Sequence, residues 1–146
     1  MRATISWALR AGLAALFLYA GVAKLVDVHA FASDIANYRV VPSPLIGPFA
    51  AALPGVEIVC GLALLRAGTA RAAALLATAL VVVFTAAAAQ ALVRDINIDC
   101  DCFGSVRAPV TVATIVRDAV FLAAGVAAVV LAPANEKAPR AERPGG

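Results

Sequence analysis

The sequence has few charged residues. Asp, Glu, Lys and Arg make up 14% of its 146 residues, whereas an ordinary soluble domain contains about 25%. Apolar residues make up 63% instead. This composition excludes an ordinary soluble domain and predicts a membrane protein, which contacts the lipid bilayer and has no nucleic-acid partner.

Aromatic residues, histidine and cysteine are also scarce. Aromatic residues make up 6% of the chain, and there are one histidine and three cysteines. A structural zinc site usually takes four ligands, and Cys100, Cys102 and His29 supply too few, so we expect no metal. The sequence also shows no aromatic cluster suited to a cofactor, and it assigns none.

Four apolar stretches are each near the ~20 residues that a helix needs to cross a bilayer. They cover about 4–23, 45–65, 72–93 and 112–132. The sequence therefore predicts an all-α integral membrane bundle of four helices over residues 1–132. Residues 133–146 mix charge, proline and glycine without periodicity, and we expect a disordered tail there.

The first stretch has some features of a signal peptide. Arg2 precedes the apolar run, and the small residues near 20–23 imitate a cleavage site. The run is long, however, it contains Arg10, and three more spans follow it. We therefore expect it to remain as a transmembrane helix.

The segment between the first two spans has its own apolar pattern. Apolar residues recur at helical spacing at Leu25, Val28, Phe31, Ile35 and Tyr38. This pattern predicts an amphipathic helix on the outer surface, ended by Pro42 and Pro44. The alternative is a helical extension of the first span that packs on the bundle.

The basic residues predict the orientation in the membrane. One side of the predicted bundle has Arg2, Arg66, Arg71, Lys137, Arg140 and Arg143, and the other has Lys24, Arg39, Arg94 and Arg107. The positive-inside rule places the larger group, and with it both termini, in the cytoplasm. The polar stretch NIDCDCFGS (97–105) is then extracytoplasmic, where cysteines can be oxidised.

Cys100 and Cys102 in this stretch are one residue apart. In an extended chain their Cα atoms lie near the ~6.8 Å limit for a disulfide, so only a strained ring would form. A strained disulfide suits thiol exchange better than stabilisation of a fold. We favour this reading over two inert cysteines and over a metal site.

The charges around the two thiols oppose one another. Asp99 and Asp101 disfavour the thiolates, whereas Arg94, Arg107 and, if they are close, Lys24 and Arg117 favour them. Cys102 has an acidic neighbour on one side only, so we expect it to be attacked first. Cys60 lies about 22 Å below the outer end of its span near Leu45, at 1.5 Å per residue. We expect it to be a small apolar side chain buried in the bundle.

Arg10 and Glu57 are charged residues within predicted spans. They lie about 8 and 12 Å above the inner ends of their spans, at 1.5 Å per residue, and we expect them to form an ion pair. Such a pair either relieves the burial of both charges and holds two helices in register or handles protons. The sequence leaves both readings open.

A second group of polar residues lies at the level of the cysteine stretch. It consists of Lys24, Asp27, Gln90, Arg94, Arg117 and Asp118. One reading is a polar pocket under that stretch that supports its chemistry. The other is ordinary anchoring of helix ends at the membrane surface.

Five stretches together carry a resemblance to a known family. They are YAGVAKLVD (19–27), FASDIANYRVVP (31–42), PGVEIVCGLALL (54–65), DCDCFG (99–104) and TVATIVRD (111–118). Their order resembles the methylamine utilisation protein MauE family, within the DoxX-like four-helix membrane proteins, over about residues 5–132. The family motif usually reads Cys-Gly-Cys-Phe-Gly, so Asp101 is a departure that affects the thiol potential.

The resemblance implies a function. MauE-like proteins are implicated, with a thioredoxin-like partner, in maturing the disulfide-rich small subunit of methylamine dehydrogenase, and Cys100 and Cys102 carry over as the redox pair. The electron outlet would be a thioredoxin-like protein or a membrane quinone bound among the helices. The alternative function is a non-catalytic accessory or scaffold of a redox complex.

Overall fold

The computed structural model describes residues 1–94 and 111–132. Their elements are α1 (Arg2–Val26), α2 (Val28–Tyr38), α3 (Ser43–Leu65), the 3-10 helix η1 (Ala67–Thr69), α4 (Ala70–Val93) and α5 (Val112–Leu131). The described residues contain no strand, which confirms the all-α prediction. Cys100, Cys102 and the predicted tail at 133–146 lie outside the described residues.

Within the part of the chain that the structure describes, four helical segments are long and apolar enough to cross a membrane. They are α1, α3, η1 together with α4 (Ala67–Val93), and α5. Three of the predicted spans lie inside these segments, and the span predicted at 112–132 matches α5 to within one residue. The prediction of a membrane bundle of four helices is therefore confirmed.

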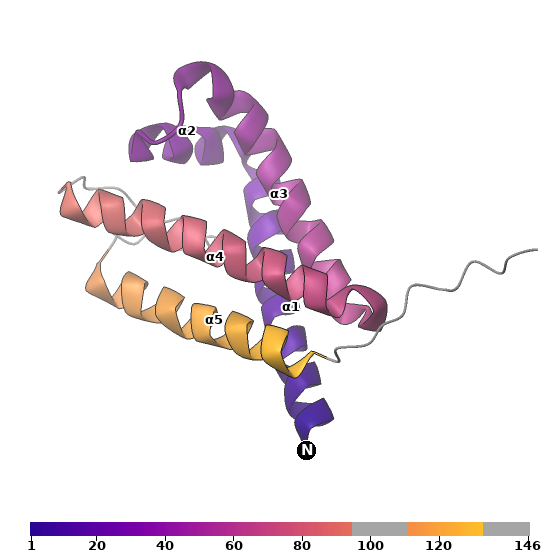
Figure 1. Ribbon diagram of the computed structural model, residues 1–146. Helices are drawn as coiled ribbons and strands as arrows, with labels where there is room; N and C mark the ends of the chain where they lie inside the picture. The colour runs from indigo at the N-terminus through magenta and orange to yellow at the C-terminus, as the bar shows by residue number, and fades with distance from the viewer. Residues whose placement is uncertain (95–110, 133–146) are drawn as a thin grey trace, which may run out of the picture.

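The four long helices are arranged as two pairs. α3 packs against α1, and α4 and α5 run side by side across that pair (Figure 1). The core between them consists of Leu13, Ala14, Phe17, Cys60, Leu64, Ala73, Ala74, Ala77, Val81 and Ala128. Half of these side chains are alanine, and small residues let membrane helices approach closely.

Two glycines set the close contact between α1 and α3. A Cβ added at Gly21 would lie 2.9 Å from the carbonyl oxygen of Pro54, and one at Gly61 would lie 3.1 Å from that of Ala14. Both distances are too short for a normal carbon contact, so a larger residue would push the helices apart. These two contacts fix the antiparallel register of α1 and α3, in which Gly21 lies beside the helical turn from Pro54 to Ile58.

Helix α2 lies between the first two long helices in the chain and packs mainly on α3, as the upper part of Figure 1 shows. Asp27 separates it from α1 and caps it, because the Asp27 Oδ1 accepts a hydrogen bond of 2.9 Å from the Ala30 amide. Phe31 and Tyr38 are its buried residues. The predicted separate helix is therefore present, and it also contacts the bundle.

The predicted end of α2 was wrong. The helix ends at Tyr38, where Arg39 adopts a left-handed conformation with a φ of 52°. Pro42 and Pro44 instead begin α3, as its N-cap and a residue of its first turn. Proline is accepted there because the first helical N–H groups have no partner within the helix.

Candidate functional site

Lys24 and Glu57 form an ion pair between α1 and α3. The Lys24 Nζ donates hydrogen bonds of 2.8 and 2.9 Å to the two carboxylate oxygens of Glu57. Lys24 is 4% exposed and Glu57 is 0% exposed. Both charges are removed from solvent inside helices that are apolar enough to cross a membrane, where each would be costly without the other.

Helix geometry explains why these two residues meet. Side chains on an α-helix lean toward its N-terminus. In the antiparallel pair α1 and α3, Lys24 and Glu57 therefore lean toward each other, and they meet near the level of Gly21. The missing side chain at Gly21 lets the Glu57 Cβ approach that position closely.

The predicted pair of Arg10 and Glu57 was wrong. Arg10 is 7% exposed, and its Nε donates a hydrogen bond of 2.8 Å to the carbonyl oxygen of Leu64. Helix α1 extends beyond α3 at this end, so Arg10 lies level with the last turn of α3. Depth calculated from residue number alone omitted both this offset and the lean of the side chains.

Arg10 has a different role at that helix end. The last carbonyl groups of a helix have no partner within the helix, and they form the negative end of its dipole. Leu64 is the residue before the end of α3 at Leu65. The Arg10 guanidinium therefore caps the C-terminal end of α3 with a donor and a positive charge.

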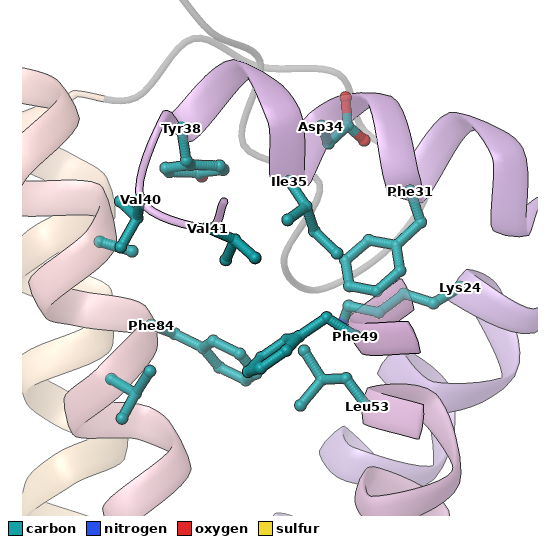
Figure 2. Close-up of a pocket in the computed structure, with 12 residues that line it drawn as sticks. Lys24, Phe31, Asp34, Ile35, Tyr38, Val40, Val41, Phe49, Leu53 and Phe84 are labelled. Atoms are coloured by element: carbon teal, nitrogen blue, oxygen red, sulfur yellow. The ribbon is translucent and has the colours of Figure 1, made fainter. Parts of the chain in front are cut away.

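A cavity lies next to the ion pair, between α2, α3 and α4. Its volume is about 190 Å³. Twelve residues line it: Lys24, Phe31, Asp34, Ile35, Tyr38, Val40, Val41, Phe49, Leu53, Val83, Phe84 and Ala87. Figure 2 shows Phe31, Phe49 and Phe84 pointing into the same space from three different helices.

The cavity contradicts the sequence argument against an aromatic cluster. Four of its residues are aromatic, namely Phe31, Tyr38, Phe49 and Phe84. Of these four residues, only Phe31 and Tyr38 are close in sequence, so no local sequence pattern predicted the cluster. Composition alone does not show how a fold concentrates a few aromatic side chains in one place.

Lys24 connects the ion pair to the cavity. Its Nζ lies 5.4 Å from the ring centroid of Phe31 and 5.4 Å from that of Phe84. A cation within about 6 Å of an aromatic face is attracted by the ring quadrupole. The buried ammonium is thus held by one carboxylate and two rings, and it faces the cavity that those rings line.

Gln90 and Arg94 lie at the C-terminal end of α4. With its amide oriented to satisfy both neighbours, Gln90 donates to the backbone carbonyl of Tyr38 at 3.3 Å and accepts from Arg94 Nη1 at 2.8 Å. The end of α4 is thereby joined to the end of α2. Gln90 and Arg94 therefore hold together two of the helices that surround the cavity, although neither residue lines it.

The other predicted supporting residues contact near neighbours. Arg117 donates through Nη2 to Asp118 Oδ1 at 3.0 Å, in the first turns of α5. Asp118 is buried, and Asp27 caps α2. Of the six supporting residues, Lys24 is the one that lines this cavity, whose wall is largely apolar rather than polar.

Cys60 lies in the core of the bundle. It is fully buried, and its Sγ donates a weak hydrogen bond of 3.5 Å to the carbonyl oxygen of Ala73. This agrees with the prediction of a small buried apolar side chain. Cys100 and Cys102, the predicted redox pair, lie outside the described residues, and the segment that holds them connects Arg94 to Thr111.

The chain is similar to the proteins of one known family. The profile of the family described as Methylamine utilisation protein MauE matches residues 2–132. The methylamine utilization protein MauE of Paracoccus denitrificans is 36% identical over 132 residues, which cover 89% of this chain and 71% of that protein. The MauE protein of Paracoccus versutus is 36% identical over 144 residues, which cover 97% and 74%. That of Methylophilus methylotrophus is 37% identical over 97 residues, which cover 66% and 50%. No solved structure matches the chain.

Proposed function

Because this chain belongs to the methylamine utilisation protein MauE family, we propose that it is a membrane protein of thiol–disulfide exchange. It assists the maturation of an extracytoplasmic enzyme, such as the disulfide-rich small subunit of methylamine dehydrogenase. A soluble thioredoxin-like protein is its partner. The observation that carries the proposal is the family match over residues 2–132 together with the DCDCFG stretch inside it.

The proposed chemistry takes place at Cys100 and Cys102. A thiolate of the partner attacks one sulfur of the strained disulfide, and a mixed disulfide forms while the other cysteine leaves as a thiolate. The second partner thiol then displaces the remaining sulfur. Two electrons and two protons move from the partner dithiol to the Cys100/Cys102 pair, and the same steps in reverse oxidise this protein.

The fold supports this proposal at the ends of its helices. The segment with the two cysteines follows Arg94, which is joined through Gln90 to the end of α2, and it leads to Thr111 at the start of α5. The C-terminal end of α4 and the N-terminal end of α5, which flank this segment in the sequence, both lie at the end of the bundle that carries α2 (Figure 1). The basic-residue count favours an extracytoplasmic location for that end.

A single-cysteine variant tests the exchange directly. In Cys100→Ser no internal disulfide can form, so the Cys102 thiolate attacks the disulfide of an oxidised thioredoxin-like partner and releases one partner thiolate. The resulting mixed disulfide should accumulate, because the variant lacks the second thiol that would displace the partner. The adduct should appear on non-reducing gels of alkylated membranes and disappear with reductant. Cys102→Ser is the matched control and should trap much less adduct.

A double variant separates the redox function from the scaffold alternative. Cys100→Ser/Cys102→Ser should abolish maturation of the client enzyme, while the protein still accumulates in the membrane. Normal client yield from this variant would contradict the redox proposal. It would favour a non-catalytic accessory that positions a complex through its helices.

A further inference from the structure

The cavity between α2, α3 and α4 has the size of one substituted ring. Its volume is about 190 Å³, and an apolar protein cavity of about 150 Å³ binds benzene. A single six-membered ring with small substituents fits this space.

The charges around the cavity favour a neutral ligand. The Lys24 ammonium at its wall disfavours a cation, and an anion gains little because Glu57 already balances that charge at 2.8 and 2.9 Å. A neutral molecule is not repelled by the Lys24 ammonium and leaves the Lys24–Glu57 pair balanced. If its oxygen atoms accept hydrogen bonds, it also gains from the nearby ammonium.

The wall of the cavity favours a planar ring over an acyl chain. Phe31, Phe49 and Phe84 point into it from three helices (Figure 2), and aromatic rings gain from offset-stacked or edge-to-face contacts with another ring. A saturated chain gains neither these contacts nor an interaction with Lys24. A ligand with such a ring would reach the cavity through the lipid that surrounds a bundle of this kind.

We propose that this cavity binds the head ring of a lipid-soluble quinone, with one carbonyl oxygen directed toward Lys24 and the ring packed against Phe49 and Phe84. The binding does not depend on the proposed thiol exchange. The role of the bound quinone as an electron acceptor does rest on the proposed thiol exchange, because reduction of a quinone to a quinol takes up two electrons and two protons. Oxidation of one dithiol to a disulfide releases the same number.

Photoaffinity labelling tests the binding with the full-length protein in detergent. An azido-substituted short-chain ubiquinone should label peptides from α2, from the first half of α3 and from the second half of α4, and excess decylubiquinone should suppress the labelling. Phe84→Leu and Phe49→Leu should each weaken the competition by decylubiquinone roughly three- to tenfold, as expected for loss of one ring contact.

The matched control is Phe121→Leu, the same change on α5 away from this cavity, which should leave the competition unchanged. Lys24→Gln/Glu57→Gln removes both charges together and should weaken quinone binding without leaving a lone buried charge. Labelling confined to α5, or equal suppression by a saturated fatty acid, would overturn the proposal. So would unchanged competition in both Phe84→Leu and Phe49→Leu. A Cys100→Ser/Cys102→Ser variant should still bind quinone, so failure of the thiol proposal is distinguishable from failure of this one.

Discussion

Lys24 and Glu57 show how two costly residues become acceptable inside an apolar bundle. A buried charge without a partner is strongly unfavourable, whereas a close pair with good geometry recovers much of that cost. Here both carboxylate oxygens accept from the same ammonium, and two aromatic rings surround it. The pair therefore holds α1 and α3 in one register and places a positive charge beside the cavity.

Removing one partner of this pair should lower the free energy of unfolding more than removing both partners. Glu57→Gln and Lys24→Gln should each destabilise the protein by about 3–5 kcal/mol, because each leaves a buried charge alone. The double variant should lose clearly less than the sum of the two. Thermal unfolding in detergent measures the three changes, and additive losses would show that the pair does not interact.

Arg10 supplies the control for this cycle. Its donor contact is the carbonyl oxygen of Leu64, not Glu57. The effects of Arg10→Gln and Glu57→Gln should therefore add to within about 0.5 kcal/mol. A strong coupling between these two residues would restore the pair that the sequence predicted.

At the scale of the helix, α2 depends on its cap as well as on its two buried side chains. It has only 11 residues, and isolated helices shorter than about 12–15 residues are marginal in water. Asp27 supplies the acceptor for the Ala30 amide, while Phe31 and Tyr38 supply the packing. A change at the cap should therefore act on α2 before it acts on the bundle.

Asp27→Ala should loosen α2 selectively, at a cost of about 1 kcal/mol for a lost N-cap. Hydrogen exchange should become faster in Val28–Tyr38 and stay unchanged in α4. Asp27→Asn keeps an acceptor oxygen and is the matched control. Unchanged exchange in α2 after Asp27→Ala would mean that packing alone maintains the helix.

The contact of α1 with α3 depends on a missing side chain. Gly21→Ala would place a Cβ 2.8 Å from the Ile58 Cγ1 and 2.9 Å from the Pro54 oxygen, and we expect a loss of about 1–3 kcal/mol from overpacking. Gly12→Ala in the same helix has open space and should be neutral or stabilising. Thermal unfolding of the two variants compares them, and equal effects would contradict the close contact.

At the scale of the whole molecule, the orientation in the membrane decides the compartment of the proposed cysteine chemistry. The balance of basic residues favours cytoplasmic termini. A cysteine introduced at Asn37 or Ser105 should then react with an impermeant maleimide added from outside. One introduced at Gly68 or Ala138 should react only after the membrane is opened.

These assays should use a background without Cys100 and Cys102. Asn37 and Gly68 are both exposed in the described structure, so a difference between them reports the side of the membrane rather than burial. Labelling of position 68 from outside would reverse the orientation. It would also place the cysteine stretch in the cytoplasm and remove the argument from an oxidising compartment.

The sequence by itself determined the number and type of the long helices. An apolar stretch of about 20 residues in lipid must satisfy its backbone hydrogen bonds internally, and a helix does so without reference to the rest of the fold. For the same local reason the sequence singled out Lys24, Arg10 and Glu57, since charges near or within such stretches are rare. Its apolar spacing also predicted a helix between the first two spans, but left open whether that helix is separate or an extension of the first span.

The tertiary structure decided which of these residues meet. Glu57 pairs with Lys24 rather than with Arg10 because Gly21 and Gly61 fix the register of α1 against α3 and because side chains lean toward the start of their helix. The cavity likewise depends on Phe31, Phe49 and Phe84, which are brought together from three helices. Contacts between distant segments depend on how helices dock, and no local pattern in the sequence carries that information.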